Sequence, residues 1–362
     1  MDIARGIGII LVVLGHNAAC AKGTPYYSLI FSFHIPLFFF LSGHFHKRAD
    51  QIGQEIPQRA KKLLVPYFLT GFLFIIYKAC QTPADFYTRD VWQLLGGMVY
   101  GAGGSGTPVS FLYWPPVWFL TSLFLTQVSF SLLQPFAEKF KSRLVRLGFF
   151  AGFLILGVNN LHHWGNTYLH MGETRIILTA TGLPWNLDLL PVTLFYYWLG
   201  WESRSLNLLK AGLSRSGGIP VLLLSAGLFC IYQLQHARVG NDAWLLDLNL
   251  RSYGHAILTT AGAILGILLI LALSTGLEKY APKGIRKALV LPGLQSLTIL
   301  VFHYFFQEQA QQVLAKKFPQ SPWITFSVSF VAGVVIPLLL YLLILQKIPW
   351  LRSVYGNQGT QR

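Results

Sequence analysis

The chain has 362 residues, of which 53% are hydrophobic and only 11% are charged, and its mean hydropathy is +0.50. Because soluble globular proteins carry about 25% charged residues, this composition excludes an ordinary soluble protein and predicts an integral membrane protein. The net charge of +15 would indicate nucleic-acid binding in a soluble chain, but here it has to be compared with the positions of the membrane segments.

Apolar runs near the length that spans a bilayer predict an all-α, polytopic protein of about ten transmembrane helices. We expect these helices at roughly residues 3–21, 26–44, 63–80, 116–133, 145–161, 184–200, 218–235, 254–274, 290–306 and 324–346. With a cytoplasmic N-terminus, 20 of the 28 Lys and Arg residues then lie in inner segments, as the positive-inside rule requires. Both termini are therefore predicted to be cytoplasmic, and nucleic-acid binding is rejected. Residues 1–350 are expected to form one transmembrane domain, followed by a short cytoplasmic tail, 351–362.

The first apolar segment contains an arginine and a histidine, Arg5 and His16. Ionisable residues inside a membrane are costly and usually mark a functional site. Eleven residues of helix return to nearly the same face, about 16 Å further along the axis. We therefore expect Arg5 toward the cytoplasm and His16 toward the outer side of one interior stripe.

Three further candidate residues lie in the second segment and in the loop after it. His34 lies near the expected bilayer midplane with Pro36, which frees a backbone carbonyl and favours a helix that lines a cavity. Arg59 and Lys62 share a face if that loop is helical. They fit a positive-inside anchor and a phosphate-binding site equally well.

Two later segments carry one ionisable residue each near the outer side. Asp188 begins the sixth segment and is either a functional acid or a carboxylate that interacts with a helix N-terminus. His303 lies in the ninth segment, where a lone histidine is often structural. Trp118 opens the fourth segment and by itself fits an interfacial aromatic belt. The other histidines lack acids at ligand spacing, so no metal is predicted.

Several of these segments resemble the acyltransferase-3 family, ten-helix membrane O-acyltransferases that move acetyl or other acyl groups onto sugars. The stretch from Arg5 to His16 resembles the family's first-helix signature of an arginine, ten residues and a histidine. Residues 33–43, with the sequence FHIPLFFFLSG, resemble the second-helix motif. Residues 118–120 and 296–303 resemble further family patterns.

One segment indicates a subgroup, and another departs from the family. Residues 184–188 (PWNLD), followed by Phe195-Tyr196-Tyr197, are most similar to fucose 4-O-acetylase-like proteins. Arg59-Ala60-Lys61-Lys62 stands where the family has an RxxR motif. Lysine meets phosphate as a point charge and lacks the bidentate geometry of arginine.

The resemblance implies transfer of an acetyl group from cytoplasmic acetyl-CoA to a hydroxyl of a cell-envelope or exported saccharide, such as an exopolysaccharide, at a bacterial inner membrane. The expected partners are acyl-CoA, a saccharide or lipid-linked glycan, and the lipid bilayer, with a homo-oligomer left open. Direct transfer with a histidine base and a transient acyl-histidine both stay open. The assigned residues are Arg5, His34, Arg59 and Lys62 for the donor, His16, Asp188 and His303 for catalysis, and Trp118, Trp185 and Asn186 for the acceptor.

Two other functions use the same kinds of residue. A saccharide or small-acid transporter, or flippase, would also need ionisable groups inside the membrane, and it would move substrate without consuming acetyl-CoA. A membrane sensor or scaffold would bind without turnover. The residues alone support an enzyme and a transporter about equally, and the resemblance favours the enzyme.

Overall fold

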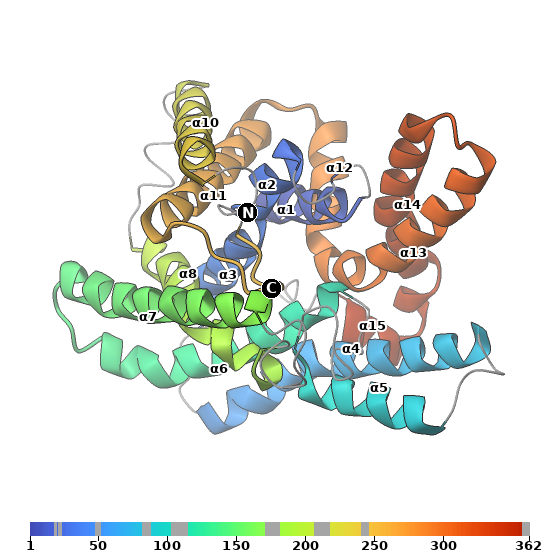
Figure 1. Cartoon of the computed structure of the whole chain (residues 1–362), viewed down its shortest axis with the longest axis horizontal. Helices are drawn as coiled ribbons and strands as arrows, with labels where there is room; N and C mark the ends of the chain where they lie inside the picture. The colour runs from blue at the N-terminus through green and yellow to red at the C-terminus, as the bar shows by residue number, and fades with distance from the viewer. Residues whose placement is uncertain are drawn as a thin grey trace. The chain divides into compact units, whose positions relative to one another are not determined.

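The computed structural model describes residues 1–17, 20, 24–47, 52–81, 88–102, 115–170, 182–205, 218–239 and 246–356. Within these ranges the chain is helical, apart from turns and an isolated antiparallel bridge between Asp247 and Ser252. The predicted all-α class is therefore confirmed. The chain divides into two compact units, whose helices Figure 1 colours along the sequence.

Unit 1 comprises residues 1–41, 202–246 and 254–362. Two of its neighbouring helix pairs, α13 with α14 and α10 with α11, lie side by side in Figure 1. Its elements are α1 (Asp2–Gly15), α2 (Pro25–Phe31), α10 (Ile219–Val239), α11 (Ala256–Tyr280), α12 (Lys283–Leu294), α13 (Ser296–Lys317), α14 (Pro322–Leu343), η4 (Leu345–Lys347) and α15 (Pro349–Tyr355). The Thr298 hydroxyl of α13 donates to the carbonyl of Tyr355 at 3.2 Å. The beginning of the predicted tail is thus part of a packed helix.

Two glycines bring α1 and α12 into backbone contact. A Cβ atom on Gly6 would lie 1.8 Å from the carbonyl oxygen of Leu289, and one on Gly293 would lie 2.0 Å from the carbonyl oxygen of Asp2. A close approach of this kind admits only residues without a side chain. The crossing fixes the start of α1, which carries Arg5, against α12.

Unit 2 comprises residues 42–201 and 247–253. Two helices, α3 (His34–His44) and α8 (Leu190–Ser203), each contain a unit boundary. The other elements are α4 (Ile52–Gln81), α5 (Thr88–Tyr100), η2 (Pro115–Val117), α6 (Trp118–Ala137), α7 (Arg143–His170) and η3 (Pro184–Leu189). Helix α6 packs against α4 and η3, and this packing positions the polar residues of η3.

Six stretches of the described residues are long and apolar enough to cross a membrane, namely Pro25–His44, Gly53–Cys80, Trp118–Ala137, Arg143–His162, Ala256–Tyr280 and Pro322–Lys347. The bent pair α12 and α13 would make a seventh. Helix α1 has 14 residues, about 21 Å at 1.5 Å per residue, which is shorter than a bilayer core of about 30 Å. The predicted total of ten spans and the cytoplasmic termini stay predictions.

Three predicted spans are not single straight helices. The second is divided between α2 and α3 by a turn at Ser32 and Phe33, which places Pro36 in the first turn of α3, where no intrahelical N–H is needed. The ninth bends by 85° at Gln295, between α12 and α13. The sixth was expected to begin at residue 184, but α8 begins at Leu190 after the 3-10 segment η3.

Candidate functional site

Three of the predicted histidines come together in unit 1. His16 follows the last residue of α1, and its ring centroid lies 5.2 Å from that of His303 on α13. The Phe31 ring lies between His16 and His34, with centroids 6.2 Å and 4.6 Å away. We call His16, His34 and His303 the histidine group. The sequence placed these residues on three separate segments, and the fold of unit 1 gathers them.

Each member of the histidine group uses the same ring nitrogen to bind the backbone carbonyl four residues earlier in the chain. The Nδ1 atoms of His16, His34 and His303 lie 2.8, 2.9 and 2.9 Å from the carbonyl oxygens four residues earlier, on Val12, Ile30 and Ile299. A carbonyl oxygen can only accept, so each Nδ1 carries the hydrogen. In the neutral ring the lone pair is then on Nε2, which is the atom able to accept a proton.

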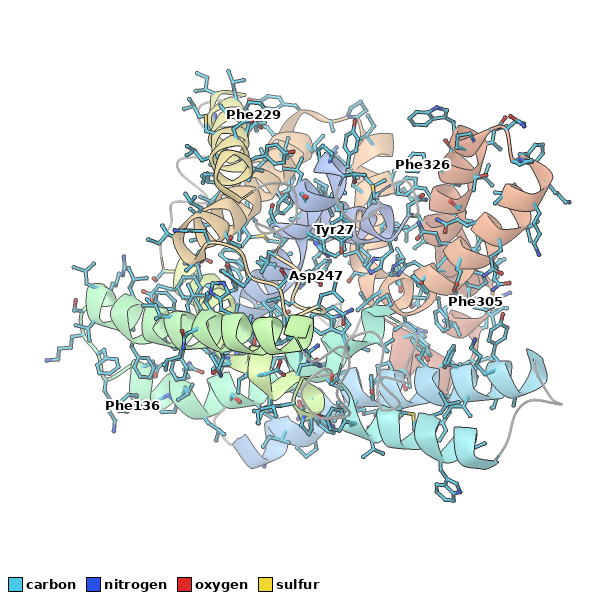
Figure 2. All side chains as sticks on the ribbon, in the orientation of Figure 1. Tyr27, Phe136, Phe229, Asp247, Phe305 and Phe326 are labelled. Atoms are coloured by element: carbon cyan, nitrogen blue, oxygen red, sulfur yellow. The ribbon has the colours of Figure 1, made fainter. Side chains whose placement is uncertain are left out.

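Polar side chains connect the end of α1 to α13 and α14. The amide of Gln307 donates to the carbonyl of Val13 at 3.1 Å. The amide of Asn17 donates to the hydroxyl of Ser329 at 3.0 Å and to the carbonyl of Phe326, which Figure 2 labels, at 3.2 Å. These buried bonds hold the segment that carries His16 in one orientation.

Two buried acceptors on α13 have no hydrogen-bond partner among the described residues. They are Nε2 of His303 and Oε1 of Gln307, which lie one helical turn apart on α13. A buried polar atom without a partner costs about 1–3 kcal/mol. Such a cost is usual where a ligand or a water completes the bonding.

Arg5 lies on the same helix as His16, as predicted. Its Nη1 is 3.3 Å from Oδ1 of Asp2, and its side chain is 28% exposed. Helix α1 is continuous from Asp2 to Gly15, so the predicted axial separation of about 16 Å between Arg5 and His16 follows. Which membrane side each one faces stays a prediction.

A second polar group lies in unit 2 and is centred on Arg251. Its Nε donates to Oδ2 of Asp188 at 3.0 Å, and its Nη2 donates to Oδ1 of Asn186 at 2.9 Å. The other oxygen of Asp188 accepts from the backbone N–H of Leu183 at 3.0 Å. We call Arg251, Asp188 and Asn186 the Arg251 network. The predicted role of Asp188 beside His16 stays a prediction, and its partner in this structure is Arg251.

The Arg251 network holds unusual backbone. Trp185, Asn186 and Arg251 have φ values of 56°, 60° and 54°, a left-handed conformation that costs about 1–3 kcal/mol for residues other than glycine. The Asn186 amide donates to the carbonyl of Gly101 at 3.1 Å and to the carbonyl of Trp118 at 3.2 Å. The indole of Trp185 donates to the carbonyl of Val99 at 2.8 Å. These bonds keep the strained segment in place.

The loop that carries Arg251 is closed by backbone bonds. Asp247, labelled in Figure 2, and Ser252 exchange both backbone hydrogen bonds, at 3.0 and 2.8 Å. The carboxylate of Asp247 also accepts from the backbone N–H of Leu250 at 3.1 Å. The tight loop fixes the direction of Arg251. In the sequence this arginine was visible only as one cation of an outer connection.

Arg59 and Lys62 lie on α4. This helix begins at Ile52, before both residues, whereas the span was expected to begin after them, at residue 63. The guanidinium of Arg59 donates to Glu55 through Nη2 at 2.5 Å and Nε at 3.1 Å, and to the carbonyl of Gln127 through Nη1 at 2.9 Å. Lys62 is exposed. Each guanidinium nitrogen of Arg59 therefore has a partner, and a phosphate that binds the paired Nε and Nη2 donors would have to displace Glu55.

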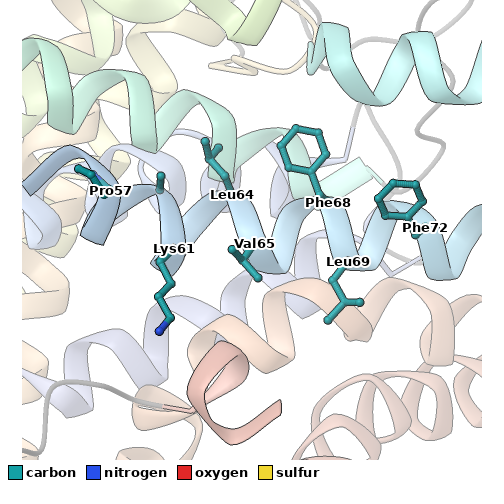
Figure 3. Close-up of a pocket in the computed structure, with 8 residues that line it drawn as sticks. Pro57, Lys61, Leu64, Val65, Phe68, Leu69 and Phe72 are labelled. Atoms are coloured by element: carbon teal, nitrogen blue, oxygen red, sulfur yellow. The ribbon is translucent and has the colours of Figure 1, made fainter. Parts of the chain in front are cut away.

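An apolar groove of about 590 Å³ runs along one face of α4. Figure 3 shows its lining residues, with Pro57 and Lys61 toward one end and Phe72 at the other. Residues at this spacing form a single helical stripe. Except for Lys61, the stripe offers hydrocarbon alone, so it is suited to apolar contact and not to catalysis.

Comparison with known proteins decides the family. Residues 1–342 match the acyltransferase domain of the Acyl_transf_3 family. The chain belongs to the acyltransferase-3 family. It is therefore a membrane acyltransferase, as the resemblance predicted. This acyltransferase-3 protein is also 37% identical over 76 residues to nodulation protein NolL of Mesorhizobium japonicum, which covers 18% of this chain and 20% of the relative. The match thus spans about a fifth of that protein. No solved structure matches the chain.

The structure of this acyltransferase-3 protein distributes the predicted residues over its two units. Unit 1 gathers the histidine group and carries Arg5 on the same helix as His16. Unit 2 contains the other predicted residues, Arg59, Lys62, Trp118, Trp185, Asn186 and Asp188. Sequence reasoning missed Arg251 and Gln307. A glutamine one turn after His303 was the available signal for Gln307, because residues four apart share a helix face.

Proposed function

We propose that this acyltransferase-3 protein transfers an acetyl group from acetyl-CoA to a hydroxyl of a cell-envelope or exported saccharide at a bacterial inner membrane. The observation that carries the proposal is the hydrogen bond from Nδ1 of His16 to the carbonyl of Val12. It leaves the lone pair of the neutral ring on Nε2, as a general base requires. His16 is thus the base, and α1 fixes its tautomer.

The transfer step follows from this tautomer. The sugar hydroxyl oxygen attacks the thioester carbonyl carbon while its proton passes to Nε2 of His16. The carbon–sulfur bond then breaks, and the CoA thiolate leaves and takes the proton from the imidazolium. A general base of this kind contributes about 10²–10⁴-fold to the rate.

The two unpartnered acceptors support a hydroxyl-bearing substrate next to His16. Because Nδ1 of His303 carries its hydrogen and the Gln307 amide nitrogen donates to Val13, Nε2 of His303 and Oε1 of Gln307 can only accept. A group that satisfies both must be a donor. A sugar hydroxyl is a donor, whereas a thioester is not.

The assignment of residues that bind the saccharide acceptor rests on the resemblance of residues 184–188 to fucose 4-O-acetylase-like proteins. In the Arg251 network the polar atoms of Asn186 and Asp188 are bonded within the protein. We infer that these two residues act by positioning. The half-buried ring of Trp185, on the same segment, is the surface offered to the sugar.

The test is acetyl transfer by the purified full chain in lipid nanodiscs. Labelled acetyl-CoA is supplied with fucosylated, exopolysaccharide and lipid-linked glycans. His16→Ala is expected to lower transfer by about 10²–10⁴-fold, and His44→Ala, outside the histidine group, serves as the control. Near-normal transfer by His16→Ala would remove His16 from the mechanism. Saccharide transport without release of CoA would favour the transporter. Label retained on the protein without acceptor would establish an acyl-histidine.

A further inference from the structure

A polar pocket of about 330 Å³ lies within unit 1 where α1, α11 and α12 meet. Asp2 and Ile3 line it from α1, and Glu278 lines it from α11. The side of the pocket formed by α12 carries three cations, Lys283, Arg286 and Lys287. In the sequence these cations counted only toward the positive-inside bias. Their convergence on one pocket is a property of the fold.

The three cations are disposed to receive an anion. Residues three and four apart lie on one face of a helix, so Arg286 and Lys287 are on the face of Lys283. Nε of Arg286 is buried without a partner among the described residues. Its Nη1 lies 3.4 Å from the carbonyl oxygen of Glu278, a long contact for a hydrogen bond. The guanidinium therefore keeps unused donors.

The helix terminus adds to this positive field. Helix α12 begins at Lys283, and the N–H groups of its first turn and the positive end of its dipole favour phosphate. Two carboxylates also border the pocket, Asp2 and Glu278. Asp2 is neutralised by Arg5 at 3.3 Å. Three lysine and arginine charges against Glu278 leave the pocket positive.

We propose that the pocket binds the phosphate groups of the acyl-CoA donor through Lys283, Arg286 and Lys287. This inference rests on the proposed function and deepens it by naming where the donor's head is held. Several phosphates need several cations, and arginine binds phosphate through paired donors. The pocket supplies such a set, whereas the guanidinium of Arg59 already donates to Glu55 and Gln127.

The position of the pocket relative to the histidine group agrees with this role. Asp2 lines the pocket, and Arg5 is bonded to Asp2. Arg5 and His16 lie on nearly the same face of α1, about 16 Å apart along the axis. A donor whose phosphates lie at the pocket would extend its pantetheine arm along this face. The thioester would then approach His16.

The experiment measures binding separately from transfer. Isothermal titration of the full chain in detergent uses CoA and adenosine 3′,5′-bisphosphate, which carries phosphates of the head without the arm. The triple variant K283A/R286A/K287A is compared with K279A/K347A/R352A, which removes equal charge from unit 1 outside the pocket. One charge-assisted contact contributes about tenfold to affinity. We therefore expect K283A/R286A/K287A to bind both probes at least about hundredfold more weakly than the wild type. The affinity of K279A/K347A/R352A should change by less than about twofold.

The outcomes separate the two proposals. Equal affinity of the pocket variant and the wild type for both probes would overturn the pocket assignment, even if acetyl transfer occurs. A wild type that neither binds CoA nor consumes acetyl-CoA would overturn the proposed function itself. If the triple variant does not elute as a folded protein, K283Q and K287Q, at two exposed positions, and R286K give the same comparison. R286K is expected to bind more tightly than R286A.

Discussion

The histidine group of unit 1 and the Arg251 network of unit 2 are both polar clusters in a membrane protein, but they differ in how their atoms are bonded. In the Arg251 network, both carboxylate oxygens of Asp188 and both amide atoms of Asn186 have partners. In the histidine group, Nε2 of His303 has none in the described structure, and neither has Oε1 of Gln307, one turn further along α13. A fully bonded network rigidifies a fold, whereas unused acceptors are available to a substrate.

The comparison shows how to separate polar residues that react from polar residues that support the fold. The free-energy cost of a polar side chain in a membrane does not separate them, because both kinds carry it. The two kinds differ in whether the side chain still has a donor or acceptor without a partner. Asp188 was expected in catalysis and its carboxylate is bonded as a support, while Nε2 of His303 has no partner in the described structure.

The largest predicted loss of stability concerns the Arg251 network. Arg251→Ala would leave Asp188, whose side chain is 2% exposed, as a buried unpaired charge, which costs about 3–5 kcal/mol of unfolding free energy. Thermal and denaturant unfolding of the purified protein measures this loss. Adding Asp188→Asn removes the stranded charge and is expected to recover much of the stability. A double variant whose losses simply add would show that the two side chains are not coupled.

A smaller loss is expected where α1 crosses α12 and carries Arg5. Gly6→Ala would place a methyl group 1.8 Å from the carbonyl oxygen of Leu289, and overpacking of this kind costs about 1–3 kcal/mol. Gly276→Ala is the matched control, because a Cβ there meets nothing within 4 Å. We expect a lower melting temperature for the first variant only. Identical melting of both would contradict the close crossing.

The next prediction tests the unused acceptor. His303→Gln is expected to lower kcat by about tenfold, equivalent to about 1.4 kcal/mol, because a neighbouring hydroxyl of the sugar loses the ring acceptor that orients the substrate near His16. The KM for acetyl-CoA should stay constant, because His303 is not assigned to the donor. His255→Gln, at the N-cap of α11, is the control. A raised KM with unchanged kcat would instead place His303 in donor binding.

The smallest effect is expected at Arg59. Its pair with Glu55 lies one helical turn along α4, and such pairs contribute about 0.3–0.5 kcal/mol, to which the bond to Gln127 adds about 1 kcal/mol. We expect Arg59→Ala to lower stability by about 1 kcal/mol and to leave the KM for acetyl-CoA within about twofold. A tenfold rise in that KM would move the phosphate site from α12 to α4.

The sequence determined the features that depend on composition and local periodicity. Hydropathy predicted a helical membrane protein, and the matched motifs indicated the acyltransferase-3 family, to which the chain belongs. The relation of Arg5 to His16 was also predictable, because both lie on one regular helix whose rise and turn are fixed. Helices such as α6 and α11 begin two residues after the starts of the predicted spans.

Only the tertiary structure decided the helix breaks and the partners of the polar groups. Hydropathy averages over a window and does not register the bend at Gln295 or the left-handed residues before α8. Arg251 and Asp188 are 63 residues apart, and no local pattern connects them. Likewise, His16 meets His303, and α1 completes the pocket beside the three cations of α12, because α1 packs against helices that are distant in the sequence. Such contacts depend on the packing free energy summed over the whole unit. The sequence of one segment is not enough to predict that free energy.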